Sequence, residues 1–464
     1  MKMNKYLVMA FVAMSFVACS NEEDPINAGG DGNENSNASD AYAAFSISVP
    51  FSEAITRATD DGVAKENTVT SLHVFMYDVV APYAPTVAEF SVSGGTLGLK
   101  QGTSNVWETS KAIKTKKADK HIFVGVNLNN DIVKEITSTG FGAFNYREFA
   151  QTVAQLTDGT NGFVMFNDKF PVVTPENALF DTETEAEAAH IQLSVDRTVA
   201  KAAVFKGSGF VVNGGGEMSN LSYGWRNINS KFYFVQKVDG GVIKDYNWDH
   251  FTVPVDYFVR GTDEIAVNDN GVAATEFSYA LENTFDYSPS ITVDEATYLS
   301  ISGNFRPDKV IALKGGVSTP QTGADFETVN NSSAPNSNFY VVRTNDGVAN
   351  YFADDAVATA FANLCIAGAN GMPSLTGPYD VSNYTYIGGK CYYHVFVNAN
   401  ATAAPYAPFN VYRNQYFKVT INSIQAPGNP GDNFDDGKPI STDAWIAVDI
   451  EVNPWNLIEE NHDL

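Results

Sequence analysis

The chain is 464 residues long, more than one hydrophobic core usually serves, so two domains are expected. Its formal net charge is −25, because 54 Asp and Glu oppose 29 Lys and Arg. This balance argues against nucleic acid as a partner and against electrostatic docking to anionic lipid, since both need basic patches. With 44% hydrophobic and 12% aromatic residues, the chain has ample material for packed sheets.

The first residues are typical of an export signal. Lys2 and Lys5 precede a mostly apolar run at 6–18, which is too short to span a bilayer, so we expect a signal peptide at 1–18. The run ends in FVAC, which resembles a bacterial lipobox and predicts lipidation of Cys19. The acidic segment at 20–24 resembles a tag for the outer face of the outer membrane. No other segment has the length and apolarity of a membrane span.

A strand pattern stands close to an exposed arginine at 41–57. Apolar residues alternate with small or polar ones, which predicts a strand with one buried face formed by Phe45, Ile47, Val49 and Phe51. The segment ends at Arg57, followed by Ala58 and two acidic residues, a sequence that a trypsin-like protease can cut. We therefore interpret 19–57 as a lipidated propeptide that contains a removable strand.

The rest of the chain is dominated by short strand patterns separated by polar or glycine-containing stretches. This arrangement favours antiparallel β-sandwiches. Strands are expected at 72–77, 120–126, twice within 186–205, and at 231–235, 296–301, 384–397 and 416–421, and helices at 141–156 and 356–365. A glycine cluster at 207–218 predicts a boundary between domains 58–212 and 213–464.

The C-terminus repeats the pattern of the removable strand. Alternation at 445–455 places Ile446, Val448, Ile450 and Val452 on one face, and Trp455 ends the run. A linker rich in Gly, Pro and Asp precedes it at 426–439. We expect 445–464 to be a tethered strand that another copy of the chain can accept.

No catalytic motif was found, and an enzyme is the least supported interpretation. The six histidines form no metal-binding helix pattern, and nucleophile-elbow, Walker and dinucleotide-binding motifs are missing from the sequence. The run at 432–437 departs from a calcium loop at a ligand position, so no metal and no cofactor is expected. Cys365 and Cys391 remain after Cys19 is lipidated, and the sequence leaves a disulfide or two buried thiols equally open.

Several segments, taken in order, carry a resemblance to a known family. Besides Cys19 and the Arg57-Ala58 site, they are VDRTVAK at 195–201, YALEN at 279–283, ATYLSISGNFRP at 296–307, GGKCYYHVFV at 388–397, RNQYFKV at 413–419 and VNPW at 452–455. Together they resemble the fimbrillins of Bacteroidales, most closely the major subunit of short, Mfa-type fimbriae. The linker before the last strand is shorter here than in that subunit.

The resemblance implies an all-β fold of two transthyretin-like antiparallel β-sandwich domains with a few short helices. It implies a structural subunit of a cell-surface fimbria (a pilus), exported as an outer-membrane lipoprotein precursor, cleaved after Arg57 and polymerised by donor-strand exchange. Adhesion and biofilm formation would follow. The implied partners are other copies of itself, accessory fimbrial subunits, lipoprotein signal peptidase, an Arg-specific protease, and host or bacterial surface ligands.

Two alternatives stay open at this point. One is an accessory subunit at the tip or the membrane anchor; Arg57 argues against an anchor, and no extra domain typical of a tip protein is evident in the sequence. The other is a monomeric surface glycan-binding lipoprotein, in which Trp225, Trp248 and Tyr257 would be exposed and stack on sugars.

Overall fold

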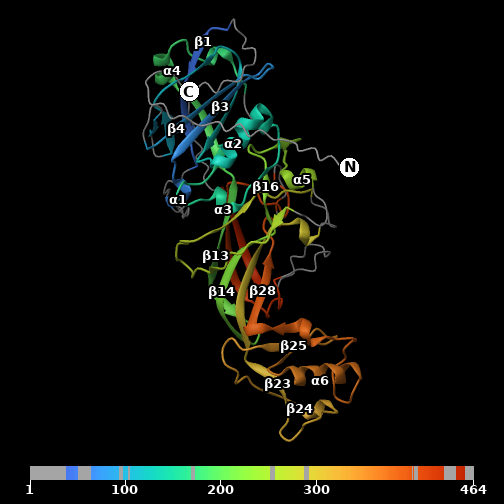
Figure 1. Cartoon of the computed structure of the whole chain (residues 1–464). Helices are drawn as coiled ribbons and strands as arrows, with labels where there is room; N and C mark the ends of the chain where they lie inside the picture. The colour runs from blue at the N-terminus through green and yellow to red at the C-terminus, as the bar shows by residue number, and fades with distance from the viewer. Residues whose placement is uncertain are drawn as a thin grey trace, which may run out of the picture.

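The computed structural model describes residues 38–50, 64–93, 98–102, 105–168, 173–250, 257–286, 292–399, 401, 406–432 and 446–454. These residues form an elongated, mostly β molecule with three parts in a row (Figure 1). We call them the first lobe (residues up to 198), the second sandwich (residues 199–307 and 390–454) and the distal lobe (residues 308–389). The expected all-β class is confirmed.

The first lobe contains a nine-stranded sheet in the order β4-β3-β8-β10-β12-β2-β6-β5, with β11 beside β8, and a separate β1-β7 pair. Its central strands are apolar on both faces; Leu72 to Tyr77 are all buried, which is typical of a strand covered on both sides. The strands are β1 (Asp40–Ala43), β2 (Phe45–Ser48), β3 (Ser71–Asp78), β4 (Pro85–Ser91), β5 (Leu99–Gln101), β6 (Val106–Thr109), β7 (Ile113–Lys116), β8 (Lys120–Val126), β10 (Met165–Asn167), β11 (Val173–Thr174) and β12 (Ile191–Arg197).

Short helices cover this sheet: α1 (Ala64–Asn67), α2 (Asn130–Thr139), η1 (Gly140–Phe144), α3 (Val153–Leu156), η2 (Glu176–Ala178) and α4 (Glu183–Ala189). The helix expected at 141–156 is wrong. The helix α2 lies before it and ends where Gly140 adopts a positive φ of 66°. The apolar spacing instead serves a 3₁₀ turn whose Phe144 ring stacks on Phe123 with centroids 3.7 Å apart.

The second sandwich packs two four-stranded sheets, β21-β13-β29-β30 and β20-β14-β22-β28, around one core that contains Trp225. Its strands are β13 (Val199–Val212), β14 (Gly216–Arg226), β20 (Ile265–Ala266), β21 (Ser278–Leu281), β22 (Tyr298–Pro307), β28 (Lys390–Val395), β29 (Gln415–Ile424) and β30 (Ile446–Pro454). Around them lie β15 (Ile228–Asn229), β16 (Lys231–Phe232), β17 (Val238–Asp239), β18 (Val242–Ile243), α5 (Tyr246–His250), β19 (Phe258–Val259) and η3 (Val293–Glu295).

The boundary expected at 212/213 lies inside this second set of strands. β13 already pairs with β21 and β29, and the glycine cluster forms the connection from β13 to β14. The change from one sheet to the other lies at Thr198, between β12 and β13. The strand expected at 231–235 is limited to β16, which pairs with β9 (Phe149–Ala150) and so joins the first lobe to the second sandwich.

The distal lobe was not evident in the sequence. It follows β22, returns to the sandwich at β28, and has its own core, in which Phe326, Phe352 and Phe361 pack together. Its elements are β23 (Lys309–Leu313), η4 (Gly323–Asp325), β24 (Phe326–Asn330), β25 (Phe339–Arg343), β26 (Ala349–Phe352), α6 (Asp355–Ile366), η5 (Val381–Tyr384), β27 (Thr385–Tyr386) and η6 (Ile387–Gly389). The helix expected at 356–365 is confirmed as α6, which Asp354 caps through the Val357 amide.

Candidate functional site

The N-terminal strand β2 lies inside the nine-stranded sheet rather than at its edge. It pairs in parallel with β12, with Phe45 opposite Ile191 and Ser48 opposite Ser194. On its other side it pairs antiparallel with β6, with Ser46 opposite Glu108. Removing β2 would therefore leave a slot with unpaired backbone groups on both walls, a template for another strand.

The side chains predicted to form the buried face of this strand are buried. Phe45, Ile47 and Val49 are at most 4% exposed and belong to the core of the first lobe; Phe51 lies outside the described residues. Full burial of an apolar side chain of this size contributes about 1.5–3 kcal/mol as an upper bound. The opposite face is also covered at Ser46, which is 2% exposed. β2 therefore fills the slot on both faces.

The preceding strand β1 ties the same segment to a second layer. It pairs antiparallel with β7, and Tyr42 exchanges two backbone hydrogen bonds with Phe180. The Asp40 carboxylate lies 3.0 Å from the ammonium groups of both Lys114 and Lys116, and their hydrogen bonds, Lys114 first, lower the pKa of Asp40. Residues 38–50 thus have strong non-covalent ties to the first lobe.

Arg197 holds the end of this N-terminal segment. Its Nη2 donates to the Pro50 carbonyl at 2.9 Å and to Asn67 Oδ1 at 2.7 Å, and its Nε donates to the Glu66 carbonyl at 3.2 Å. The side chain is fully buried, which lowers the pKa of Arg197 to about 10. One guanidinium therefore contacts the chain on both sides of the predicted cleavage site.

Glu66 ties α1 to the second sandwich. Its carboxylate lies 3.0 Å from Lys201 Nζ and accepts a 2.7 Å hydrogen bond from the Tyr279 hydroxyl. Both Glu66 and Lys201 are fully buried, and the Lys201 ammonium lies over the rings of Phe277 and Tyr416. Burial and the Glu66 charge raise the pKa of Tyr279. The chain after Arg57 is thus anchored in the second sandwich, whereas residues 38–50 pair with the first lobe.

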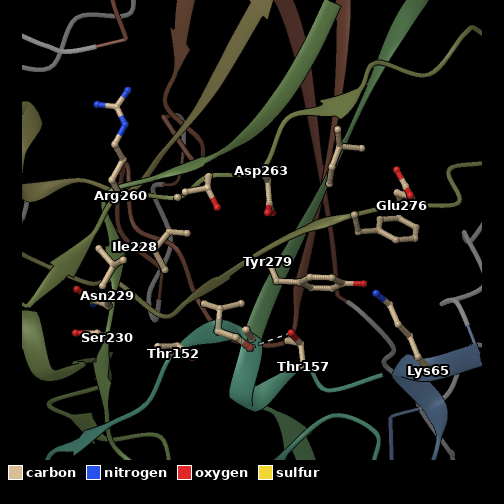
Figure 2. Close-up of a pocket in the computed structure, with 17 residues that line it drawn as sticks. Lys65, Thr152, Thr157, Ile228, Asn229, Ser230, Arg260, Asp263, Glu276 and Tyr279 are labelled. Atoms are coloured by element: carbon tan, nitrogen blue, oxygen red, sulfur yellow. Dashed lines mark hydrogen bonds between the residues drawn. The ribbon is translucent and has the colours of Figure 1, made fainter. Parts of the chain in front are cut away.

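A cavity of about 490 Å³ lies beside this anchor, between α1 and α3 on one side and the second sandwich on the other. Figure 2 shows Lys65 reaching from α1 toward Tyr279, and Lys65 Nζ lies 5.3 Å from the centre of that ring. The described lining residues mix the cations Lys65 and Arg260 with the acids Asp263 and Glu276, and contain no histidine or cysteine. The cavity therefore lies at the seam between the first lobe and the second sandwich, with charges of both signs in its lining.

The C-terminal strand β30 is an edge strand of its own second sandwich. It pairs antiparallel with β29 over its whole length, from Ile446 opposite Ile424 to Pro454 opposite Gln415. Val448 and Ile450 are half-buried against the core. The other edge of β30 pairs with no strand in the described sheet. Removal of β30 would therefore leave the pairing of β21, β13 and β29 unchanged.

Asp432, which lies within the linker at 426–439, is held by several side chains. Asp432 Oδ2 accepts from Arg226 Nε at 2.7 Å and from Arg260 Nη2 at 3.0 Å, and Oδ1 accepts from the Ser300 hydroxyl. Burial alone would raise the pKa of Asp432, but hydrogen bonds from His394, Ser300 and Arg226 together hold it far below its ordinary value. The carboxylate is thus bound to cationic side chains rather than available as a metal ligand.

We expect Asp432→Asn to destabilise the second sandwich by about 3 kcal/mol, because Arg226 would stay buried without its carboxylate. Since the pKa of Asp432 is lowered in the folded state, the native clamp stabilises the protein fully above about pH 4 and is lost as pH falls. Urea unfolding at pH 7 and pH 3 measures both effects. A loss equal at the two pH values would contradict the clamp; Asp269→Asn at an exposed ion pair is the control.

The structure places the remaining predicted residues as follows. Cys19, Arg57, Ala58, Phe51 and Trp455 lie outside the described residues. Cys365 and Cys391 are free, buried thiols in two different cores, α6 of the distal lobe and β28 of the sandwich. Burial raises the pKa of each thiol to about 11, so neither is a ready nucleophile at neutral pH.

Two of the three aromatic residues expected to stack on sugars do not lie at the surface. Trp225 is fully buried and Tyr257 is 5% exposed, while Trp248 is half-buried. Trp225 packs edge-on against Phe417 and donates from its indole to the Ser278 carbonyl. The glycan-binding alternative requires these two rings to be exposed, and both are instead buried.

Sequence reasoning missed the roles of Glu66 and Asp432. It singled out Arg197 and Lys201 only as parts of a family-like segment; Arg197 ends β12 and Lys201 lies in β13, and both side chains contact Glu66. Glu66 gave no signal, because a glutamate in a short polar run resembles any solvated residue. Among the described residues, no group of His, Cys, Asp and Glu is arranged to hold a metal, and no helix has the length and apolarity to cross a membrane.

The fold and the site thus define an all-β protein with an interior N-terminal strand in one sheet and a C-terminal strand at the edge of another. Residues 384–461 match the family model described as Major fimbrial subunit protein type IV, Fimbrillin, C-terminal. The chain therefore carries a fimbrillin C-terminal region, as its sequence resemblance indicated.

A comparison with solved structures returns several proteins, three of which are as follows. A putative cell adhesion protein from Parabacteroides distasonis is 14% identical with a TM-score of 0.46, covering 90% of this chain and 99% of that one. A putative cell adhesion protein from Bacteroides eggerthii is 11% identical with a TM-score of 0.42 (91% and 98%). The tip fimbrial protein Mfa3 from Porphyromonas gingivalis, with C-terminal truncation, is 12% identical with a TM-score of 0.38 (90% and 100%). A comparison with curated proteins finds no match.

Proposed function

We propose that this protein is a structural subunit of a cell-surface fimbria that assembles by donor-strand exchange. The observation that carries the proposal is the position of β2, an interior strand joined to the rest of its lobe through a connection that contains Arg57. Cleavage there turns a strand of the core into a separate peptide. The slot that it vacates has the walls β12 and β6 and needs a strand to fill it.

The C-terminal strand β30 supplies the matching donor. It alternates as β2 does, pairs along one edge only, and follows a linker that is held at Asp432 by Arg226. If the strand of one copy enters the slot of the next, donor and acceptor surfaces differ, so the contact is head-to-tail and does not close. A filament is the result, and the match of residues 384–461 to a fimbrillin C-terminal region supports this proposal.

Maturation in this proposal has three steps. Cys19 is acylated and carries the precursor to the outer membrane, an Arg-specific protease cuts after Arg57, and the N-terminal peptide leaves. Glu66 then keeps the new N-terminal region attached to the second sandwich, because its ion pair with Lys201 lies on the retained side of the cut. Partners are other copies of the chain and accessory fimbrial subunits, and the assembled fimbria supports adhesion.

An accessory role at the tip is the second candidate, favoured by one observation. The distal lobe is an additional unit with its own core at the end of the molecule opposite the first lobe (Figure 1). Negative-stain images of a gold-labelled subunit distinguish the two roles. Label along the whole shaft supports the structural subunit, whereas label confined to one end supports the tip.

The N-terminus of the assembled protein tests the proposal directly. We expect mass spectrometry of sheared surface filaments to find Ala58 as the first residue, with residues 19–57 missing. An acylated Cys19 as the N-terminus of the filament protein would contradict the proposal, because the slot would still hold its own strand. Cell-bound precursor from the same culture is the control and should retain the lipid.

A further inference from the structure

The cavity at the seam between the first lobe and the second sandwich has room for a short piece of chain. Its volume of about 490 Å³ lies within the roughly 300–1,000 Å³ of pockets that bind small ligands. Apolar side chains of its lining come from both parts of the molecule, with Val153 on α3 and Ile228, Ile265 and Phe277 on the second sandwich. An occupant that fills the cavity would therefore contact both parts at once.

Asp263 gives this cavity a site for a cation. Its Oδ2 accepts a 2.6 Å hydrogen bond from the Ser278 hydroxyl, which fixes the carboxylate, and Figure 2 shows it pointing into the cavity toward Tyr279. Arg260 in the same lining is paired with Asp432, and no ion pair of Asp263 is formed among the described residues. A carboxylate that faces an aromatic ring is a setting that suits an ammonium group.

The chain that leads into α1 gains such an ammonium group when it is cut. Residues 51–63 lie outside the described residues, and α1 begins at Ala64, next to the lining residue Lys65. Cleavage after Arg57 makes Ala58 an N-terminus, and an α-amino group with an ordinary pKa of about 7.7–8.0 is charged at pH 7. The segment 58–63 reaches roughly 20 Å when it is extended at about 3.3 Å per residue. Because α1 borders the cavity, this length is enough to enter it.

We infer that cleavage after Arg57 places the new N-terminus in this cavity, with the α-ammonium group of Ala58 against the carboxylate of Asp263. This inference rests on the proposed cleavage and adds a consequence within the same subunit. The segment 58–63 is the occupant, and it would join α1 to the second sandwich through a contact that the precursor does not have.

The residues that follow Ala58 match the other groups of the lining. Asp60 and Asp61 come next in the chain, and the cations of the lining are Lys65 and Arg260. Val63, the last residue before α1, is apolar, as are several of the lining side chains. A segment that begins with a cation and continues with two acids thus complements a cavity that contains both signs of charge.

Only the cut chain can make this contact. In the precursor the Arg57–Ala58 bond is a neutral amide, so no α-ammonium group exists there. The chain is also held on both sides of this bond by one guanidinium, since Arg197 binds the Pro50 carbonyl and the side chain of Asn67. After the cut, residues 58–63 remain covalently joined to α1 alone. The docked terminus would therefore distinguish the mature subunit from its precursor.

Chemical labelling of the new N-terminus tests this inference. Purified precursor is cut with an Arg-specific protease and treated with a reagent selective for α-amino groups, and mass spectrometry follows labelling of the fragment that begins at Ala58. We expect labelling at least about tenfold slower than for a free peptide of residues 58–65, because a docked amine reacts only after local opening.

Two variants assign the protection to the cavity. Asp263→Asn removes the charge but keeps an acceptor for the Ser278 hydroxyl, and it should be labelled close to the rate of the free peptide. Glu264→Gln is the matched control and should stay protected, because this neighbouring acid pairs with Lys390 and is not part of the lining. Ala154→Trp, at an exposed position of α3 in the lining, fills the cavity without changing its charge and should also abolish protection.

The outcomes separate the docked terminus from the proposed function. Labelling of the cut wild type at the free-peptide rate would overturn the docking and leave the cleavage intact. If the protease does not cut the Arg57–Ala58 bond of the native precursor, cleavage and docking are both wrong. Equal protection in wild type, Asp263→Asn and Ala154→Trp would contradict the cavity as the site. Protection confined to assembled filaments would show that a neighbouring copy covers Ala58, and it would overturn docking within one subunit.

Discussion

Replacing Arg57 with alanine is expected to leave the protein as a monomeric precursor that does not form filaments. Without cleavage, β2 stays covalently attached through a short connection to α1, and a short tether holds a strand near its slot at an effective concentration of roughly millimolar. A donor strand from another copy, present at about micromolar concentration, would occupy the slot about a thousandfold less often than the attached β2. Heat-labile high-mass ladders on mildly denaturing gels, and their loss in the variant, measure this effect.

A second variant serves as the control for Arg57→Ala, and one outcome would contradict the proposed role of cleavage. Arg147→Ala removes an exposed arginine of the same lobe and should assemble as the wild type does. The variant monomer should unfold at the wild-type urea midpoint, since its own strand still fills the slot. If Arg57→Ala precursor forms ladders as readily as wild type, cleavage is not what opens the slot, and strand exchange at β2 is wrong.

Replacing Glu66 with glutamine is expected to cost about 3–5 kcal/mol of folding stability, because it leaves the fully buried Lys201 without its carboxylate. Neighbouring aromatic rings lie within 5 Å of that ammonium but do not replace a full negative charge. The Tyr279 hydroxyl keeps an acceptor in the amide oxygen, so the loss is specific to the charge. Urea unfolding of the purified precursor measures it.

The double variant Glu66→Gln/Lys201→Met separates the ion pair from packing. Removing both charges together should recover most of the loss, since a buried pair replaced by apolar or neutral groups is often close to neutral. Glu89→Gln, at a carboxylate that is 64% exposed, should change stability by less than about 1 kcal/mol. A single Glu66→Gln variant as stable as this control would show that Glu66 does not anchor the retained N-terminal region.

The sequence predicted some properties of the two strands β2 and β30 and left others open. Alternation at Phe45, Ile47 and Val49 indicated a buried face, and the structure confirms it. That β2 is an interior strand, between β12 and β6, could not be predicted, because period-2 alternation is the same for edge and interior strands. The alternation at 446–452 likewise predicted a strand but not its pairing with β29.

The failed helix prediction has a local cause. The spacing of apolar residues at 141–156 matches a helix, but it arises from rings such as Phe141 and Phe144 that reach one core from a tight turn. The helix had already ended at Gly140, whose positive φ suits glycine. A periodic pattern reports which side chains are buried and leaves the backbone path between them open.

For this protein the amino-acid sequence alone determined the β class, the two amphipathic terminal strands, and the resemblance to fimbrillins that the family match bears out. Those properties depend on residues close together in the chain. Only the tertiary structure decided that Arg197 contacts both sides of the predicted cleavage site, that Glu66 meets Lys201, and that Asp432 within the linker is bound by Arg226. The reason is physical: each of these contacts joins residues more than 100 positions apart, and their buried charges are tolerated only because the fold brings a partner within hydrogen-bond distance.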